Sequence, residues 1–176
     1  MTRMLLLAVA LLTLAFPARA QDFPNRTIRI IVGPSPDALA RIIADMKAQK
    51  PDHIACLGDL VNIGLRAEFP PAAEFMKSVG DTEHVSLVPG NHDAYLGEST
   101  AALEQALKLF MSNDNGQFEG FPYVRLRGPV ALIGLSSAIP TAPLMAGGAL
   151  GVEQRIRLRK VLAFLKQQNL ARVLLI

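Results

Sequence analysis

Two stretches of the chain decide its fold: residues 53–62 read HIACLGDLVN, and residues 85–93 read VSLVPGNHD. Each begins with a short apolar run that predicts a buried strand and continues into a turn of glycine and polar residues. In an open α/β sheet, ligands and metal ions collect at the edge where such strands end. The two stretches therefore predict a parallel sheet with a polar site just beyond two of its strands.

The rest of the chain alternates strands with helices around these two stretches. The expected strands are 27–32, 53–57, 85–88, 123–126, 130–135 and 172–176, and the expected helices are 37–50, 67–79, 99–111 and 152–168. Ser99 is expected to cap the third helix, and Ile156, Leu162 and Leu165 to form the inward face of the fourth. The order predicts an α/β fold with a layered, mainly parallel sheet flanked by helices.

The first twenty residues have the pattern of a signal peptide. Arg3 gives a basic start, residues 5–16 are apolar, and Ala-Arg-Ala at 18–20 gives a small-residue cleavage site. The apolar run is shorter than the roughly 20 residues that span a bilayer, which favours cleavage over a stable membrane anchor. We expect export to the periplasm, with a first strand and linker at 21–36 and a domain at 37–176.

Composition narrows the classes of function. Without the leader arginines, Arg3 and Arg19, the formal charge falls from +3 to +1, and no basic stretch is interleaved with aromatic residues. A nucleic-acid-binding surface is therefore not predicted. Cys56 is the only cysteine, which excludes an intrachain disulfide, and its apolar neighbours predict a small buried side chain. The sequence carries no sign of oligomeric state.

The polar residues of the two turns suggest metal chemistry. Asp59 follows Gly58 at a predicted strand end, where its two carboxylate oxygens can bridge two divalent metal ions. Asn91 offers an amide oxygen suited to a hard metal ion. His92 can donate a proton to a substrate oxygen, and Asp93 can orient its imidazole. A purely structural interpretation stays open, since Gly-Asp and Gly-Asn pairs are common in turns and caps.

Together, GDLVN at 58–62 and GNHD at 90–93 resemble the two middle motifs of the calcineurin-like metallophosphoesterases. The resemblance extends over residues 51–176. It implies an incomplete form of that family's layered α/β sandwich. It also implies a dinuclear metal site in which metal-bound hydroxide hydrolyses phosphomonoesters or phosphodiesters.

The resemblance also implies roles for individual residues. Asp59 corresponds to the bridging metal ligand and Asn91 to a ligand of the second metal. His92 corresponds to the catalytic histidine, with Asp93 beside it. The implied cofactors are two divalent metal ions of Mn, Fe or Zn type, and the implied partner is a phosphate-ester substrate.

Other motifs of that family are missing from this sequence. The family places D-x-H after its first strand, where this chain has Gly-Pro-Ser-Pro at 33–36. It also has a histidine after a later strand, expected just beyond Ile176, and then a G-H-x-H motif. The remaining histidines, His53 and His84, do not follow predicted strands. We therefore expect a partial metallophosphoesterase domain with weak or no activity.

A second resemblance supports an alternative function. Residues 20–32, AQDFPNRTIRIIV, are similar to the start of substrate-binding proteins of tripartite tricarboxylate transporters. This indicates a non-enzymatic periplasmic solute-binding protein as the alternative, or a junction between two families with an inactive phosphoesterase remnant. A Rossmann-type nucleotide binder is disfavoured, because G-x-G-x-x-G does not follow the first expected strand.

Overall fold

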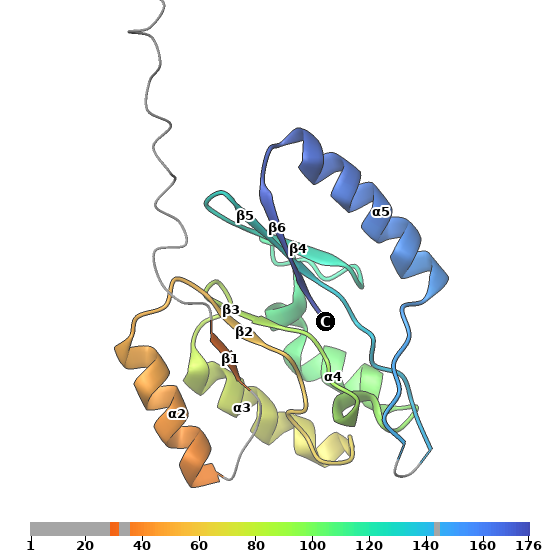
Figure 1. The fold of residues 1–176 in the computed structure, drawn as a ribbon. Coiled ribbons are helices and arrows are strands. Elements are labelled where there is room, and N and C mark those ends of the chain that lie inside the picture. Colours follow the sequence, from red (N-terminus) through yellow and green to blue (C-terminus); the bar gives the residue numbers. More distant parts are fainter. Residues whose placement is uncertain (1–28, 32–35, 143–144) are drawn as a thin grey trace, which may run out of the picture.

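The computed structural model describes residues 29–31, 36–142 and 145–176 (Figure 1). The expected leader, residues 21–28 and the Gly-Pro-Ser stretch at 33–35 lie outside the described residues. The elements, with η for 3-10 helices, are β1 (Arg29–Ile31), α2 (Pro36–Ala48), β2 (Ile54–Cys56), η1 (Arg66–Glu68), α3 (Phe69–Val79), β3 (Val85–Leu87), η2 (His92–Ala94), α4 (Ser99–Leu107), η3 (Lys108–Met111), β4 (Tyr123–Arg127), β5 (Val130–Gly134), α5 (Val152–Gln167) and β6 (Ala171–Leu175).

The described strands form two three-stranded sheets. In the first sheet, β1, β2 and β3 lie side by side and are all parallel. In the second, β5 is central, antiparallel to β4 and parallel to β6. Helices α2 and α3 cover the outer side of the first sheet, and α5 covers the outer side of the second (Figure 1). The expected layered α/β fold is confirmed, with its strands divided between two sheets rather than joined in one.

The division into two sheets follows from where the apolar residues lie. All five residues of β5 are buried, so this strand needs cover on both of its faces. Val130 and Leu132 join the core of the first sheet, whereas Ala131 and Ile133 pack against α5. Alternate residues of a strand point to opposite faces, so one apolar strand can bind two layers at once.

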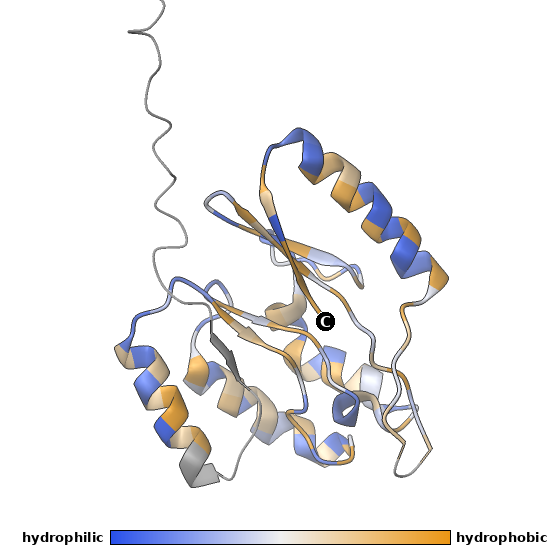
Figure 2. Cartoon of the chain, in the orientation of Figure 1, coloured by the Kyte–Doolittle hydropathy of each residue, from blue (hydrophilic) through white to orange (hydrophobic). Residues whose placement is uncertain are grey.

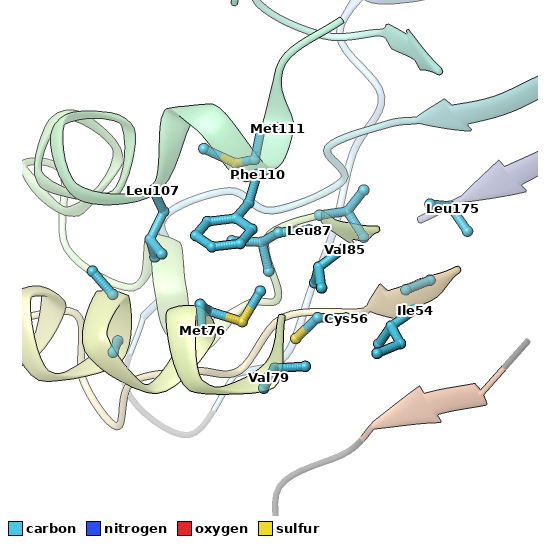
Figure 3. Close-up of a cluster of buried hydrophobic side chains, with 14 of the residues drawn as sticks. Ile54, Cys56, Met76, Val79, Val85, Leu87, Leu107, Phe110, Met111 and Leu175 are labelled. Carbon is cyan, nitrogen blue, oxygen red and sulfur yellow. The ribbon is translucent and has the colours of Figure 1, made fainter. Parts of the chain in front are cut away.

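The main core lies around the first sheet. Figure 3 shows Cys56 and Val85 of the strands beside Met76 and Val79 of α3, with Phe110 above them. Figure 2 shows the matching pattern, with strands mostly hydrophobic and helices of mixed hydropathy. Full burial of each large aliphatic side chain contributes about 1.5–3 kcal/mol. This core therefore fixes the places of β2 and β3, and the turns that follow them start from those two strand ends.

Two details of the helices differ from expectation. Ser99 is the first residue of α4 rather than its cap, and its buried hydroxyl donates to the carbonyl of Gly64 at 2.8 Å. Ile156 is 53% exposed, whereas Leu165 is buried as expected. The inward stripe of α5 instead runs through Leu158, Val161, Leu162 and Leu165. Both differences depend on where neighbouring segments pack, which local sequence patterns do not report.

Two side chains of β4 tie the second sheet to the first. The Tyr123 hydroxyl donates to the carbonyl of Leu87 at 2.8 Å, and its ring occupies the space beside Gly134. Arg125 is 2% exposed and donates only to backbone oxygens in the hydrogen bonds of the described residues. Those carbonyls belong to Thr82, Val85, Leu109 and Ser112. The guanidinium thus joins β4 to β3, to η3 and to the segments that flank them.

Candidate functional site

The turn after β2 and the turn after β3 meet at one edge of the first sheet. We name them the β2 turn (residues 57–62) and the β3 turn (residues 88–93). Because β2 and β3 are parallel and in register, both chains leave the sheet in the same direction. Asp59 Oδ1 then accepts the amide N–H of His92 at 3.2 Å. The structure therefore brings Asp59 next to the segment that carries Asn91 and His92.

Two glycines make this close approach possible. A Cβ on Gly58 would lie 1.9 Å from the amide nitrogen of Gly90, and a Cβ on Gly90 would lie 2.2 Å from Asp59 Oδ1. Gly58 has φ +86° and Asp59 has φ +56°, so two successive residues adopt the left-handed conformation. Aspartate and asparagine are among the few residues with a side chain that enter this region readily.

Asp93 lies beneath the two turns and is fully buried. Its Oδ2 accepts the amides of Asp59 at 2.8 Å and Gly90 at 2.9 Å, and its Oδ1 accepts those of Leu60 at 2.9 Å and Val61 at 3.2 Å. Burial raises the pKa of this carboxyl above its ordinary value, while the same four amides act to lower it. One carboxylate therefore joins the backbones of both turns.

His92 is oriented by a different group from the one expected. Its Nδ1 lies against the carbonyl oxygen of Asn62, and its ring stacks on Tyr95 with centroids 6.0 Å apart. The expectation that Asp93 orients the imidazole is corrected, because the ring nitrogen Nδ1 bonds the Asn62 carbonyl, whereas the Asp93 oxygens accept backbone amides of the two turns. Since a carbonyl can only accept, Nδ1 carries the proton and Nε2 is the ring atom that can meet a substrate.

Glu68 shapes the segment that follows the β2 turn, a role not expected from the sequence. Its carboxylate accepts the amides of Asn62 at 3.1 Å, Ile63 at 3.3 Å and Leu65 at 2.8 Å. The available signal was a glutamate in the first turn of a helical segment, a position that favours bonds to free amides. The Glu68 carboxylate thus holds the end of the β2 turn and the segment after it.

A cavity of about 360 Å³ borders Asp59 on the helical side of the sheet. It lies between α2 and α3, and its lining is mainly apolar, including Leu39, Phe75 and Met76. The other carboxylate in its lining is Glu68, whose oxygens bond the amides just described. The cavity therefore adds no further ligand to the site.

The other two histidines lie at the opposite edge of the sheet. His53 precedes β2 and is 1% exposed, with Nδ1 accepting from Arg127 Nε at 3.2 Å and Nε2 lying 2.7 Å from Ser86 Oγ. His84 precedes β3, is exposed, and bonds Asp81 at 2.8 Å. Both histidines thus lie before a strand, as the sequence predicts, rather than after one.

The potential metal ligands among the described residues are few. Asp59 bonds the backbone amide of His92, the residue after Asn91, and carboxylate and amide oxygens are ligand types that suit a hard divalent cation. Within residues 29–31, 36–142 and 145–176, no three His, Cys, Asp or Glu side chains are grouped around one point. Catalytic metal sites usually have three or more protein ligands. The set found here is therefore incomplete for two metal ions.

A family model described as calcineurin-like phosphoesterase matches residues 32–170. A search of curated proteins found no match. In the part of the chain that the structure describes, no helix is both long and apolar enough to cross a membrane.

Proposed function

Because the chain belongs to the calcineurin-like phosphoesterase family, whose members generally use divalent metals, we propose that Asp59 and Asn91 hold one divalent metal ion that binds phosphate esters. The observation that carries this proposal is the hydrogen bond between Asp59 and the His92 amide, which joins the two motifs. The incomplete ligand set limits hydrolysis of phosphomonoesters or phosphodiesters to a slow rate. Membership of the metal-dependent phosphoesterase family is thus assigned to this chain, whereas its slow hydrolysis of phosphate esters is proposed.

The residues of the two turns would divide the work. When bound, the metal ion supplies a Lewis acid that polarises a phosphoryl oxygen. Asp59 and Asn91 fix its place at the end of the parallel strands, where both backbones are held by the core. His92 presents Nε2 to the ester, since Nδ1 is fixed by the Asn62 carbonyl. A protonated ring there can donate to the leaving oxygen, which is general acid catalysis.

Slow hydrolysis follows from the number of ligands. Two-metal hydrolysis needs two ions about 3.5–4 Å apart, each with its own ligands as well as shared ones. Residues 33–36, which follow β1 in the sequence, contain neither aspartate nor histidine. Among the described residues, Asp59 and Asn91 are too few to hold a metal pair, so we propose that a single ion binds and that its affinity is modest.

Titration with Mn²⁺, followed by electron paramagnetic resonance, tests the metal site. Asp59→Asn is the sharpest variant, because asparagine keeps the shape and tolerates φ +56° while removing the charge. Asp81→Asn is the matched control, since Asp81 is an exposed carboxylate at the opposite edge. We expect wild type and Asp81→Asn to bind Mn²⁺ and Asp59→Asn to lose binding at least tenfold. Equal binding by all three proteins would contradict the proposed site.

Turnover of 4-nitrophenyl phosphate and bis(4-nitrophenyl) phosphate with Mn²⁺ tests the reaction. We expect a slow release of nitrophenol that requires metal and disappears in Asp59→Asn. Turnover at the rate of an efficient enzyme, abolished by the same substitution, would show that the ligand argument is wrong. Release that is unchanged in Asp59→Asn would assign the activity to another site or a contaminant.

We also propose that the protein is exported to the periplasm and that residues 1–20 are removed. The basic, apolar and small-residue segments of the leader support this, although they lie outside the described residues. Mass spectrometry of protein recovered from a Gram-negative host should find Gln21 as the first residue. Recovery of the intact chain in the cytoplasmic fraction would refute export.

A further inference from the structure

We infer that Asp93 is a positioning residue: its carboxylate holds Asp59 and the backbone before Asn91 in the geometry that binds metal, without touching metal or substrate. The inference rests on the proposed metal site and changes the role expected for Asp93. Its first support is burial, since a side chain with 0% exposure presents neither oxygen to the solvent from which metal and substrate arrive. Its second support is that the hydrogen bonds of its carboxylate run to backbone amides of both turns.

The β2 turn needs an anion at this place. The amides of Asp59, Leu60 and Val61 all point to the Asp93 carboxylate, at 2.8 to 3.2 Å. Successive amides that converge in this way form a concavity that binds negative charge. Asp59 is at the same time held at φ +56°, a conformation that a side-chain-bearing residue keeps only when its surroundings enforce it. Asp93 supplies both the charge and the constraint.

The same carboxylate controls the second ligand. Oδ2 accepts the amide of Gly90 at 2.9 Å, immediately before Asn91, and also the amide of Asp59. A single oxygen atom therefore sets the spacing between the backbones that carry the two ligands. Outer partners that orient metal ligands typically change metal affinity by 10–100-fold when they are removed. We expect Asp93 to have an effect of this size.

The test compares Asp93→Asn and Asp93→Glu with wild type and with a control variant at another buried residue that bonds the backbone. Asparagine keeps the size of the side chain but replaces one acceptor oxygen by a donor that faces the amides. Glutamate keeps both oxygens on a longer stem and should recover part of the effect. Gln154→Ala is the control, because Gln154 is buried and its amide makes two bonds to the Ser136 backbone, at 2.9 and 2.7 Å.

Two measurements are made on each protein: Mn²⁺ affinity by titration, and amide hydrogen exchange at Asp59, Leu60 and Val61 by nuclear magnetic resonance. We expect Asp93→Asn to weaken Mn²⁺ binding at least tenfold, Asp93→Glu to weaken it less, and Gln154→Ala to leave it unchanged. The three amides should exchange faster in Asp93→Asn, faster to a smaller extent in Asp93→Glu, and at the wild-type rate in Gln154→Ala. If Asp93→Asn does not fold, Asp93→Glu carries the same comparison.

The outcomes separate this inference from the proposed function. If wild type binds Mn²⁺ and Asp93→Asn binds it equally well, the inference is overturned. It is also overturned if Gln154→Ala weakens binding as much, since general destabilisation then explains the loss. If wild type binds no Mn²⁺, the proposed metal site fails, and amide hydrogen exchange alone tests whether Asp93 positions the β2 turn. Unchanged exchange at the three amides in the Asp93 variants would overturn that positioning role. Faster exchange at these amides in the Asp93 variants, but not in Gln154→Ala, would support it.

Discussion

Acid should destabilise this protein through His53, a buried and neutral imidazole. Burial, followed by the charges of Arg127 and Arg125, lowers the His53 pKa from 6.5 to about 3. In the unfolded chain the ring takes up a proton as the pH falls through 6.5, whereas in the folded protein it stays neutral until about pH 3. The unfolded state therefore binds more protons in this window, so the free energy of unfolding falls with decreasing pH and recovers as pH rises.

The magnitude follows from the two pKa values. Linkage gives a loss of about 2 kcal/mol between about pH 7.5 and about pH 5, and about 5 kcal/mol when the effect is complete near pH 3. The buried position supports a loss of this size, because the ring lies between Arg127 Nε and Ser86 Oγ. A proton added at Nδ1 would remove its ability to accept from the arginine and place two positive charges in contact.

Urea unfolding at the two pH values, followed by circular dichroism, measures this loss. His53→Gln cannot take up a proton but keeps an amide near Ser86, so its stability should be lower at neutral pH and should fall about 2 kcal/mol less than wild type on acidification. His84→Gln is the matched control, because His84 is exposed and its side chain bonds Asp81 alone among the contacts described. It should keep the wild-type loss. A pH dependence in His53→Gln equal to that of wild type would refute the reasoning.

Three further substitutions test how the layers and turns are held, each by urea unfolding. Arg125→Lys should cost about 3 kcal/mol, because one ammonium cannot replace a guanidinium that serves four carbonyls; a loss below about 0.5 kcal/mol would contradict this. Tyr123→Phe should cost about 1–2 kcal/mol by leaving a β3 carbonyl without its donor, and no loss would show that water replaces the hydroxyl. Gly90→Ala should cost about 1–3 kcal/mol and weaken Mn²⁺ binding, because its Cβ would displace Asp59. Gly97→Ala, where a Cβ meets open space, is the control and should change stability by less than about 0.5 kcal/mol.

Local patterns were sufficient to place the central strands. β2 and β3, at Ile54–Cys56 and Val85–Leu87, fall inside the expected ranges 53–57 and 85–88. Apolar runs bounded by glycine, proline and polar residues are local signals, so no knowledge of the rest of the chain is needed. The same holds for the turn residues Asp59 and Asn91, whose place after a strand depends only on the sequence beside them.

Helix faces and ends were predicted less well. The expected helix 99–111 is a helix to Leu107 followed by the 3-10 turn η3, whose carbonyl at Leu109 bonds the Arg125 guanidinium. Ile156 lies on the exposed side of α5. Which side of a helix is covered depends on the layer that it meets, and several stripes of α5 are apolar enough to serve. Because α5 connects β5 to β6, and these two strands pair in parallel, α5 packs against one face of the second sheet. That packing determines which side of α5 is covered.

The sequence by itself determined which residues stand at the ends of the strands, because strand and turn signals are carried by neighbouring residues. It also identified the family through two short motifs, which the family match over residues 32–170 supports. Only the tertiary structure decided what Asp93 does. Its partners at Asp59, Leu60 and Val61 are backbone amides more than thirty residues away. Every residue except proline carries such an amide, so no sequence pattern reports which of them will point toward a given carboxylate.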